Sequence, residues 1–253
     1  MRRVRSILAA LLLACPVTVV SLFAQGAQSG QAVNQSAQSA QRTSATSGGN
    51  LENVLNQMDA TAAHFRSAEA NVRWEQYQKV VNDTDVQEGK VYFRRTGKDI
   101  QMMADLSKPA PKFILYSDGK VQVFEPKVNR VTTYVPGKNR SDIESFVVLG
   151  FGGGGHDLLK NFDVKYAGRE NVNGVGTEKL ELTPKSARVR NMFGQLVMWI
   201  DPKLGLAIQQ QFFQPEGDYR VTKYSDIRLN QKLPDNAFKL KTDSKTKYVS
   251  PQG

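Results

Sequence analysis

Residues that build reactive sites are scarce in this sequence. One cysteine and two histidines occur among 253 residues. The cysteine, Cys15, lies in an apolar N-terminal segment, so the rest of the chain can form no internal disulfide and has no thiol chemistry. The histidines, His64 and His156, are far apart and have no carboxylate motif around them, which argues against a metal site. We expect His64 to be a structural helix residue and His156 to be a loop residue.

Motifs of enzymatic catalysis are missing as well. The sequence has no GxSxG nucleophile elbow and no pair of carboxylates that a fixed short spacing singles out. The run GFGGGGH at 150–156 lacks the Lys and Ser/Thr of a phosphate-binding loop, and we interpret its glycines as a mobile hinge. We therefore predict a protein that is not an enzyme and needs no cofactor and no metal.

Basic residues outnumber acidic ones, and the formal net charge is +10. Such a balance suits nucleic acid or an anionic membrane surface. Lys and Arg are nevertheless spread along the chain, and no helix-turn-helix, RNP or zinc-finger pattern occurs. We predict no nucleic-acid partner. The basic surface would instead guide docking to an acidic protein or to anionic lipid headgroups.

The N-terminus has the pattern of a secretory signal peptide. A cationic start, MRRVR, precedes an apolar run over 7–24 that is short for a membrane span and is interrupted by Pro16. Residues 1–24 are predicted to be cleaved on export to the periplasm. Two alternatives stay open. One is a retained N-terminal anchor, and the other is lipidation of Cys15, because LLAC resembles the lipobox of bacterial lipoproteins.

Residues 25–49 form a low-complexity segment rich in Gln, Ser, Ala, Gly and Thr. Val33 is its only large aliphatic residue, so the segment cannot bury enough apolar surface to offset the entropy lost on ordering. We predict a flexible linker over 25–49, followed by a single folded domain over 50–253. That length suits one hydrophobic core.

The folded region begins with an amphipathic helix and continues mainly as strands. From Asn50 onward, apolar residues recur at helical spacing up to Phe65. Short alternating segments follow, and Asp118-Gly119 joins two of them as a tight hairpin turn. Short helices are expected before Gly150 and at 157–161. The pattern indicates a mainly β fold with helices (α+β) and antiparallel strands. Strands are predicted at 71–77, 89–95, 100–106, 113–116, 121–125, 130–134, 163–169, 177–183, 195–201, 205–213 and 220–227.

The strand GKVYFRR at 89–95 places a charge in an unusual position. Val91, Phe93 and Arg95 share one face of the strand because successive side chains alternate. If that face lines the interior, the guanidinium needs carbonyl or carboxylate partners, and its hydrogen bonds would hold a lid shut. In the alternative reading, Arg95 ends the strand and reaches solvent. The spacing alone does not decide between the two.

Five segments, taken in order, resemble the outer-membrane lipoprotein carrier family LolA. Each motif alone is common, whereas their order and spacing together are more specific, and they extend over roughly 50–250. The segments are LENVLNQMDATAAHF at 51–65, GKVYFRR at 89–95, YSDGKVQVFEP at 116–126, ELTPK at 181–185 and LNQKLPDNAFKL at 229–240.

The resemblance implies an open, unclosed antiparallel β-barrel with a helical lid over an apolar cavity that holds acyl chains. It implies a periplasmic carrier, acting as a monomer, for acylated lipoproteins. The implied partners are an inner-membrane lipoprotein-releasing ABC transporter and an outer-membrane receptor. The alternatives share this fold. They are a carrier of another envelope lipid, an envelope-stress sensor, or a membrane-tethered receptor if Cys15 is lipidated.

The same resemblance assigns a gating role to Arg95, because the family's functional arginine ends the matching strand and bonds to lid backbone in the empty carrier. Thr96 stands where the family commonly has proline. Other candidate site residues are apolar, and each also suits an ordinary core. The candidates for the cavity wall are Trp74, Val91, Phe93, Met102, Phe113, Leu115, Met198 and Phe212. The candidates for the lid are Leu55, Met58, Phe146, Val147 and Leu149.

Overall fold

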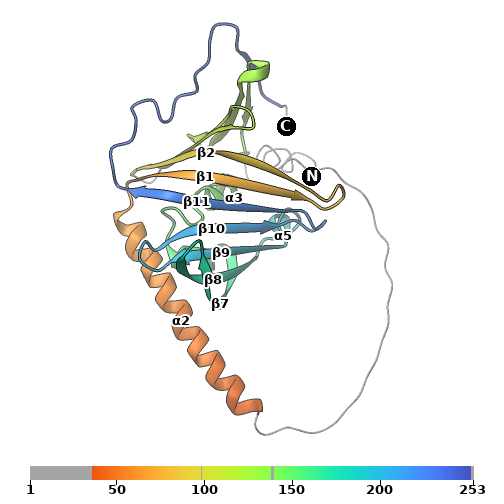
Figure 1. The fold of residues 1–253 in the computed structure, drawn as a ribbon. Coiled ribbons are helices and arrows are strands. Elements are labelled where there is room, and N and C mark those ends of the chain that lie inside the picture. The colour runs from red at the N-terminus through yellow and green to blue at the C-terminus, as the bar shows by residue number, and fades with distance from the viewer. Residues whose placement is uncertain (1–35, 98, 138–139, 252–253) are drawn as a thin grey trace.

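The computed structural model describes residues 36–97, 99–137 and 140–251, and a large twisted sheet dominates it (Figure 1). The predicted signal peptide over 1–24 lies outside these residues. Twelve strands form one sheet in the order β12-β6-β5-β4-β3-β2-β1-β11-β10-β9-β8-β7. The end strands β12 and β7 do not pair with each other. The prediction of an open, unclosed barrel is therefore confirmed.

Neighbouring strands of the sheet are antiparallel, except that β12 runs parallel to β6. The strand bounds are β1 (Ser67–Gln78), β2 (Asp83–Thr96), β3 (Asp99–Lys108), β4 (Lys112–Ser117), β5 (Lys120–Glu125), β6 (Arg130–Tyr134), β7 (Phe162–Val172), β8 (Val175–Pro184), β9 (Gln195–Asp201), β10 (Leu206–Phe213), β11 (Tyr219–Leu229) and β12 (Lys247–Val249).

Every strand predicted from alternation is present, with ends that differ by a few residues. The predicted hairpin turn is confirmed, because Asp118 and Gly119 have φ values of 53° and 70°. Strand β12 was not predicted. It has only three residues, too few for an alternating pattern to be visible.

Helices lie at one end of the sheet and behind it in Figure 1. The predicted helix start at Asn50 is wrong, because the helix that contains Asn50, α2, already includes Ser36 and so enters the predicted linker. Ser, Thr and Gly outnumber Ala and Gln in that stretch, so its composition gives no local reason for the extension. The helices are α2 (Ser36–His64), α3 (Arg140–Val147), α4 (Gly155–Asn161), α5 (Ala187–Arg190) and the 3-10 turn η1 (Pro126–Val128).

The glycine run between α3 and α4 permits close packing. A Cβ on Gly155 would lie 2.5 Å from the Cα of Leu55 in α2, and one on Gly152 would lie 2.6 Å from the ring of Phe65. Gly152 also has a positive φ of 80°. Gly155 lets the start of α4 lie against α2, and Gly152 lets the preceding connection lie against Phe65. Their role as a mobile hinge remains a prediction.

The C-terminal segment after β11 covers part of the outer face of the sheet. The guanidinium of Arg94 lies 4.5 Å from the ring centroid of Phe238, and Ala237 is buried. Asn230 anchors the start of this segment, since its side-chain oxygen accepts a 2.7 Å hydrogen bond from the backbone N–H of Arg66. Successive side chains of a strand point to opposite faces of the sheet, so Arg94 lies on the outer face and its neighbour Arg95 on the other face.

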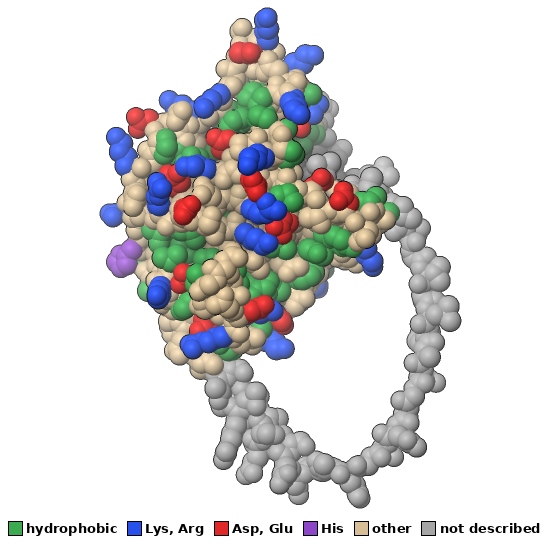
Figure 2. Space-filling view, in the orientation of Figure 1, with side chains coloured by type: hydrophobic (Ala, Val, Ile, Leu, Met, Phe, Trp, Pro, Cys, Tyr) green, Lys and Arg blue, Asp and Glu red, His purple; other side chains and the backbone are tan. Residues whose placement is uncertain are grey.

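The surface in Figure 2 shows Lys and Arg side chains scattered among Asp and Glu on the visible face, without one basic patch. Across the part of the chain that the structure describes, no helix has both the length and the apolar character needed to cross a membrane.

We predict that Gly155→Ala destabilises the fold by about 1–3 kcal/mol, because the new methyl group would overlap the backbone of α2. The free energy of unfolding in urea measures this effect. Gly176→Ala is the matched control, since nothing lies within 4 Å of its Cβ position, and it should change stability by less than about 0.5 kcal/mol. Equal effects of the two substitutions would contradict the close approach of α4 to α2.

Candidate functional site

The apolar face of the sheet and the helices share one hydrophobic cluster. We call the sheet surface that contributes to it the interior face, and α2, α3, α4 and the connecting residues 148–154 the lid. Strand alternation places the interior residues at every second position, for example Leu196, Met198 and Ile200 in β9. Of the residues predicted for wall and lid, the cluster contains Leu55, Met58, Trp74, Val91, Phe93, Met102, Val147, Leu149 and Met198, with Phe146 and Phe212 packed against it.

Two predicted wall residues, Phe113 and Leu115, are not part of this cluster. In β4 it is Ile114 and Tyr116 that join it, so alternation directs Phe113 and Leu115 to the opposite face of the sheet. There the ring of Phe113 stacks on Phe124 with centroids 5.9 Å apart. The assignment of these two residues to the wall is therefore corrected. The run FILY is apolar at every position, so alternation could not show which face is inward.

Lid side chains fill the interior. Phe151, within the glycine run, is fully buried, and its ring stacks on Phe93 with centroids 4.8 Å apart. The same ring meets the edge of Tyr224 at 4.6 Å. Phe146 of α3 contacts Phe212 of β10 at 6.4 Å. The lid thus lies against the apolar face, with aromatic side chains in the space that the resemblance to the LolA family assigns to acyl chains.

Arg95 lies where the sheet meets the lid. Its Nη2 donates a short hydrogen bond to the carbonyl of Gly152, and its Nη1 makes a 3.5 Å contact with the carbonyl of Ala62 at the end of α2. Its guanidinium also lies 5.8 Å from the ring centroid of Phe65. Arg95 is half-buried, and backbone carbonyls of two lid segments accept its hydrogen bonds. It does not simply extend into solvent.

Further hydrogen bonds tie the connection between α3 and α4 to the sheet. The Nε2 of Gln210 donates to the carbonyl of Leu149 at 2.5 Å, and the backbone N–H of Ala207 donates to the carbonyl of Gly150 at 3.2 Å. Both donors belong to β10. Because the acceptors are backbone carbonyls, the attachment depends on the shape of the lid more than on its side chains.

His156 joins two parts of the lid. Its ring Nδ1 makes a short contact with the carboxylate of Asp59, and its Nε2 lies 3.1 Å from Glu52. Both carboxylates belong to α2, whereas His156 is in the first turn of α4. The hydrogen bond to Asp59 raises the pKa of His156 above its ordinary value of 6.5. The expectation of a loop position is wrong, because this ion pair holds the residue at the helix start.

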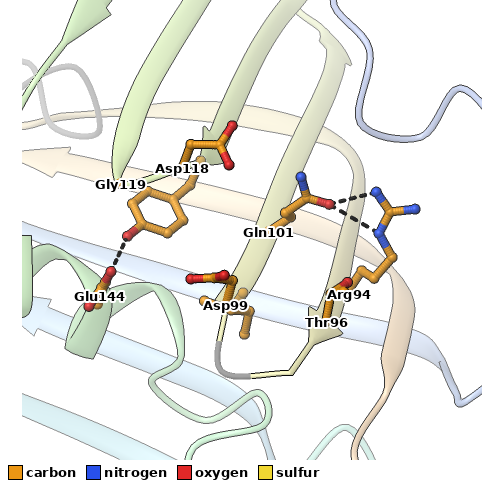
Figure 3. Close-up of a pocket in the computed structure, with 9 residues that line it drawn as sticks. Arg94, Thr96, Asp99, Gln101, Asp118, Gly119 and Glu144 are labelled. Carbon is orange, nitrogen blue, oxygen red and sulfur yellow. Dashed lines mark hydrogen bonds between the residues drawn. The ribbon is translucent and has the colours of Figure 1, made fainter.

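A polar surface pocket lies beside the lid at the β2–β3 and β4–β5 turns. It has a volume of about 300 Å³, and Asp99, Asp118 and Glu144 contribute to its wall (Figure 3). The hydroxyl of Tyr116 donates to Glu144 of α3 at 2.9 Å, which adds another link between lid and sheet. Within the described ranges, no group of three or more His, Cys, Asp or Glu side chains is placed to hold a metal ion.

Several residues that shape this site escaped prediction. Phe151 carried a usable signal, since it is the one aromatic residue within the glycine run. Gln210 and Arg220 gave none, because polar residues on a strand are expected to face water. Both are buried, and both belong to the interior side of the sheet.

A family model described as outer membrane lipoprotein carrier protein LolA matches residues 66–241. The match spans β1 to β11 and is narrower than the predicted extent of 50–250, since α2 precedes it. No curated protein compared with the chain matches it in sequence.

Solved structures of low sequence identity also align with the chain. An uncharacterized conserved protein from Thermus thermophilus is 12% identical, with 79% of this chain and 98% of that chain covered and a TM-score of 0.49. A DUF1329 family protein from Desulfovibrio piger is 16% identical, with 74% and 94% covered and a TM-score of 0.43. A putative outer membrane lipoprotein-sorting protein domain from Vibrio parahaemolyticus is 14% identical, with 75% and 95% covered and a TM-score of 0.43.

The ion pair of His156 predicts that the free energy of unfolding depends on pH. Because the pKa of His156 is raised in the folded protein, its stabilising contribution is complete below the ordinary value of 6.5 and is lost as pH rises through the raised value. Urea unfolding from about pH 6 to about pH 9 should show the wild type losing stability relative to His156→Gln. Parallel stability curves for the two proteins would contradict the ion pair.

Proposed function

The chain belongs to the LolA family of outer membrane lipoprotein carrier proteins, and we propose that it carries lipoproteins with their acyl chains held in its apolar interior. In this proposal the described state is the empty carrier. The lid occupies the interior face until acyl chains replace it. No covalent chemistry is involved, and the protein acts by binding and release.

The observation that carries the proposal is the attachment of the lid through Arg95. The guanidinium donates to the carbonyl of Gly152, beside Phe151, whose ring fills the interior. Backbone carbonyls are uncharged partners, so moving the lid leaves no carboxylate stranded in an apolar site. Such a contact can be broken and remade more readily than a buried ion pair. It therefore suits a lid that opens and closes in each carrier cycle.

Loading exchanges one set of apolar contacts for another. Withdrawal of Phe151 and Leu149 exposes Phe93, Met102 and Met198, which acyl methylenes would then cover. Each buried methylene stabilises the loaded state by about 0.8 kcal/mol, and recovery of the lid contacts on release offsets much of this gain. The flexible thioether side chains of Met102 and Met198 let the interior face adapt to chains of different shape.

The cellular setting of the proposal follows from the N-terminal sequence. Removal of residues 1–24 on export would leave the protein in the periplasm, with residues 25–49 ahead of the domain. There the proposed route runs from an inner-membrane lipoprotein-releasing ABC transporter to an outer-membrane receptor, and the carrier travels as a monomer. We include these partners in the proposal because the chain belongs to the LolA family.

The experiment that tests the proposal is a release assay. Spheroplasts that hold labelled lipoproteins and the matching transporter are incubated with the purified protein, and the soluble fraction is examined for acylated lipoprotein bound to it. A stable one-to-one complex is the expected result. If the folded protein releases nothing while its own transporter is present, the lipoprotein-carrier function is wrong.

Arg95→Leu separates loading from release in the same assay. We expect this variant to load lipoprotein but to pass it on at least about tenfold more slowly, because the closed empty state loses its charge-assisted hydrogen bond. Arg94→Leu is the matched control, since Arg94 bonds to Gln101 and faces away from the lid. Unchanged transfer by Arg95→Leu would remove Arg95 from the mechanism without affecting the proposed cargo.

A further inference from the structure

A second arginine, Arg220, lies on the interior face at the far end from Arg95. In the sheet it is paired with Gln76 of β1 on one side and Phe212 of β10 on the other. Alternation along β11 places it on the same side as Thr222 and Tyr224, and Tyr224 packs against the main core. The residue is only 8% exposed. Its side chain therefore points into the space that the proposed function assigns to the ligand.

The charge of Arg220 has no anionic partner among the described residues. Its Nε donates to the side-chain oxygen of Gln76 at 3.2 Å, and its guanidinium carbon lies 4.9 Å from the ring centroid of Trp74. No ion pair in the described ranges involves it, and its outer nitrogens, which have no protein acceptor there, keep some contact with solvent. Burial lowers the pKa of Arg220 to about 9, and no carboxylate counteracts that shift. The contrast is with Lys223 on the same strand, which pairs with Glu75 at 2.9 Å.

A buried cation without a counter-charge is unfavourable in the empty protein. An oxyanion bound at the outer nitrogens would supply the missing charge. Arginine's planar fork matches carboxylate and phosphate, and it can bind either through two parallel hydrogen bonds. The ring of Trp74 would support one side of the guanidinium while the anion approaches along its edge. These features belong to a headgroup site at the end of an apolar interior.

We propose that the interior takes an amphiphile with an oxyanion headgroup, and that Arg220 binds this carboxylate or phosphate while the acyl chain extends toward Arg95. The inference rests on the proposed acyl-chain interior but goes beyond the proposed lipoprotein cargo, because acyl chains that are linked as esters and amides have no free oxyanion. Strand β1 measures the distance between the two arginines. Its residue Ser67 pairs with Arg94, the neighbour of Arg95, and its residue Gln76 pairs with Arg220. At ~3.3 Å per residue the two ends lie roughly 30 Å apart, whereas one leaflet of acyl chains spans about 15 Å. The interior is therefore long enough for a chain whose headgroup stays at Arg220.

The two tryptophans provide a direct optical test. Trp74 contacts Arg220, whereas Trp199 belongs to a separate cluster on the opposite face and donates to Glu170 at 2.9 Å. In a Trp199→Phe background, the fluorescence of Trp74 reports binding at the headgroup site. The probes are dodecanoate, dodecyl phosphate and dodecanol, which share one chain and differ in the headgroup, together with inorganic phosphate. All are used below their micelle-forming concentrations.

We expect the two anionic amphiphiles to bind about tenfold or more tightly than dodecanol, as a charge-assisted hydrogen bond predicts. Arg220→Met should reduce that preference to about twofold or less while dodecanol binding is retained. Arg228→Met is the matched control, because Arg228 lies on the same strand and is exposed, and it should keep the preference. If Arg220→Met does not fold, the double change Gln76→Leu with Arg220→Met replaces both hydrogen-bonding partners by apolar groups and serves the same purpose.

Four results would overturn the inference. Equal binding of dodecanol and dodecanoate by the wild type, or an undiminished preference in Arg220→Met, would show that Arg220 reads no headgroup and would leave the acyl-chain interior intact. Binding of inorganic phosphate as tight as that of dodecyl phosphate would identify a site for free anions. Absence of binding by every amphiphile would overturn the inference, whereas the release assay decides separately whether the protein carries lipoproteins.

Discussion

The hydrogen bond from Arg95 to the carbonyl of Gly152 joins the sheet to the lid, and the proposed function depends on it. The arginine reaches the lid only because β2 places it on the same face as Val91 and Phe93. The carbonyl is presented to it because glycine at 152 accepts a φ of 80° and leaves room for Phe65. A side chain at that position would displace the carbonyl. This contact, together with the hydrogen bonds from β10 to the carbonyls of Leu149 and Gly150, places the neighbouring aromatic ring in the interior.

Charge is distributed so that closing the lid costs little. Arg95 bonds to carbonyls, and Gln210 donates to the carbonyl of Leu149, so these two attachments of the lid involve no carboxylate. The ion pair of His156 lies at the rim, where its side chain is 41% exposed. Arg220 is the exception, because its buried charge has no anionic partner among the described residues. The interior is thus apolar in its middle and has an arginine at each end.

The sequence predicted the strands well and the site unevenly, for physical reasons. Alternation located the strands because one face of each is buried, and the Asp118-Gly119 turn was visible because it needs positive φ. Alternation failed in the all-apolar run around Phe113 and Leu115, where both faces of the sheet are covered. It also failed at Arg220, where a polar residue faces inward. The ion pairs of His156 join segments that are distant in sequence, and no local pattern encodes such contacts.

The proposed function requires the lid to leave the interior face on loading, and an engineered disulfide tests this requirement. A Cβ on Gly150 would lie 2.7 Å from that of Ala207, close enough for Gly150→Cys and Ala207→Cys to be bridged after a small shift. With Cys15 replaced by Ser, no other cysteine is present to interfere. Binding of an acyl ligand is measured with the bridge oxidised and then reduced. The account predicts that the oxidised protein binds no ligand and that reduction restores binding. Equal binding in both states would show that the acyl chains lie elsewhere.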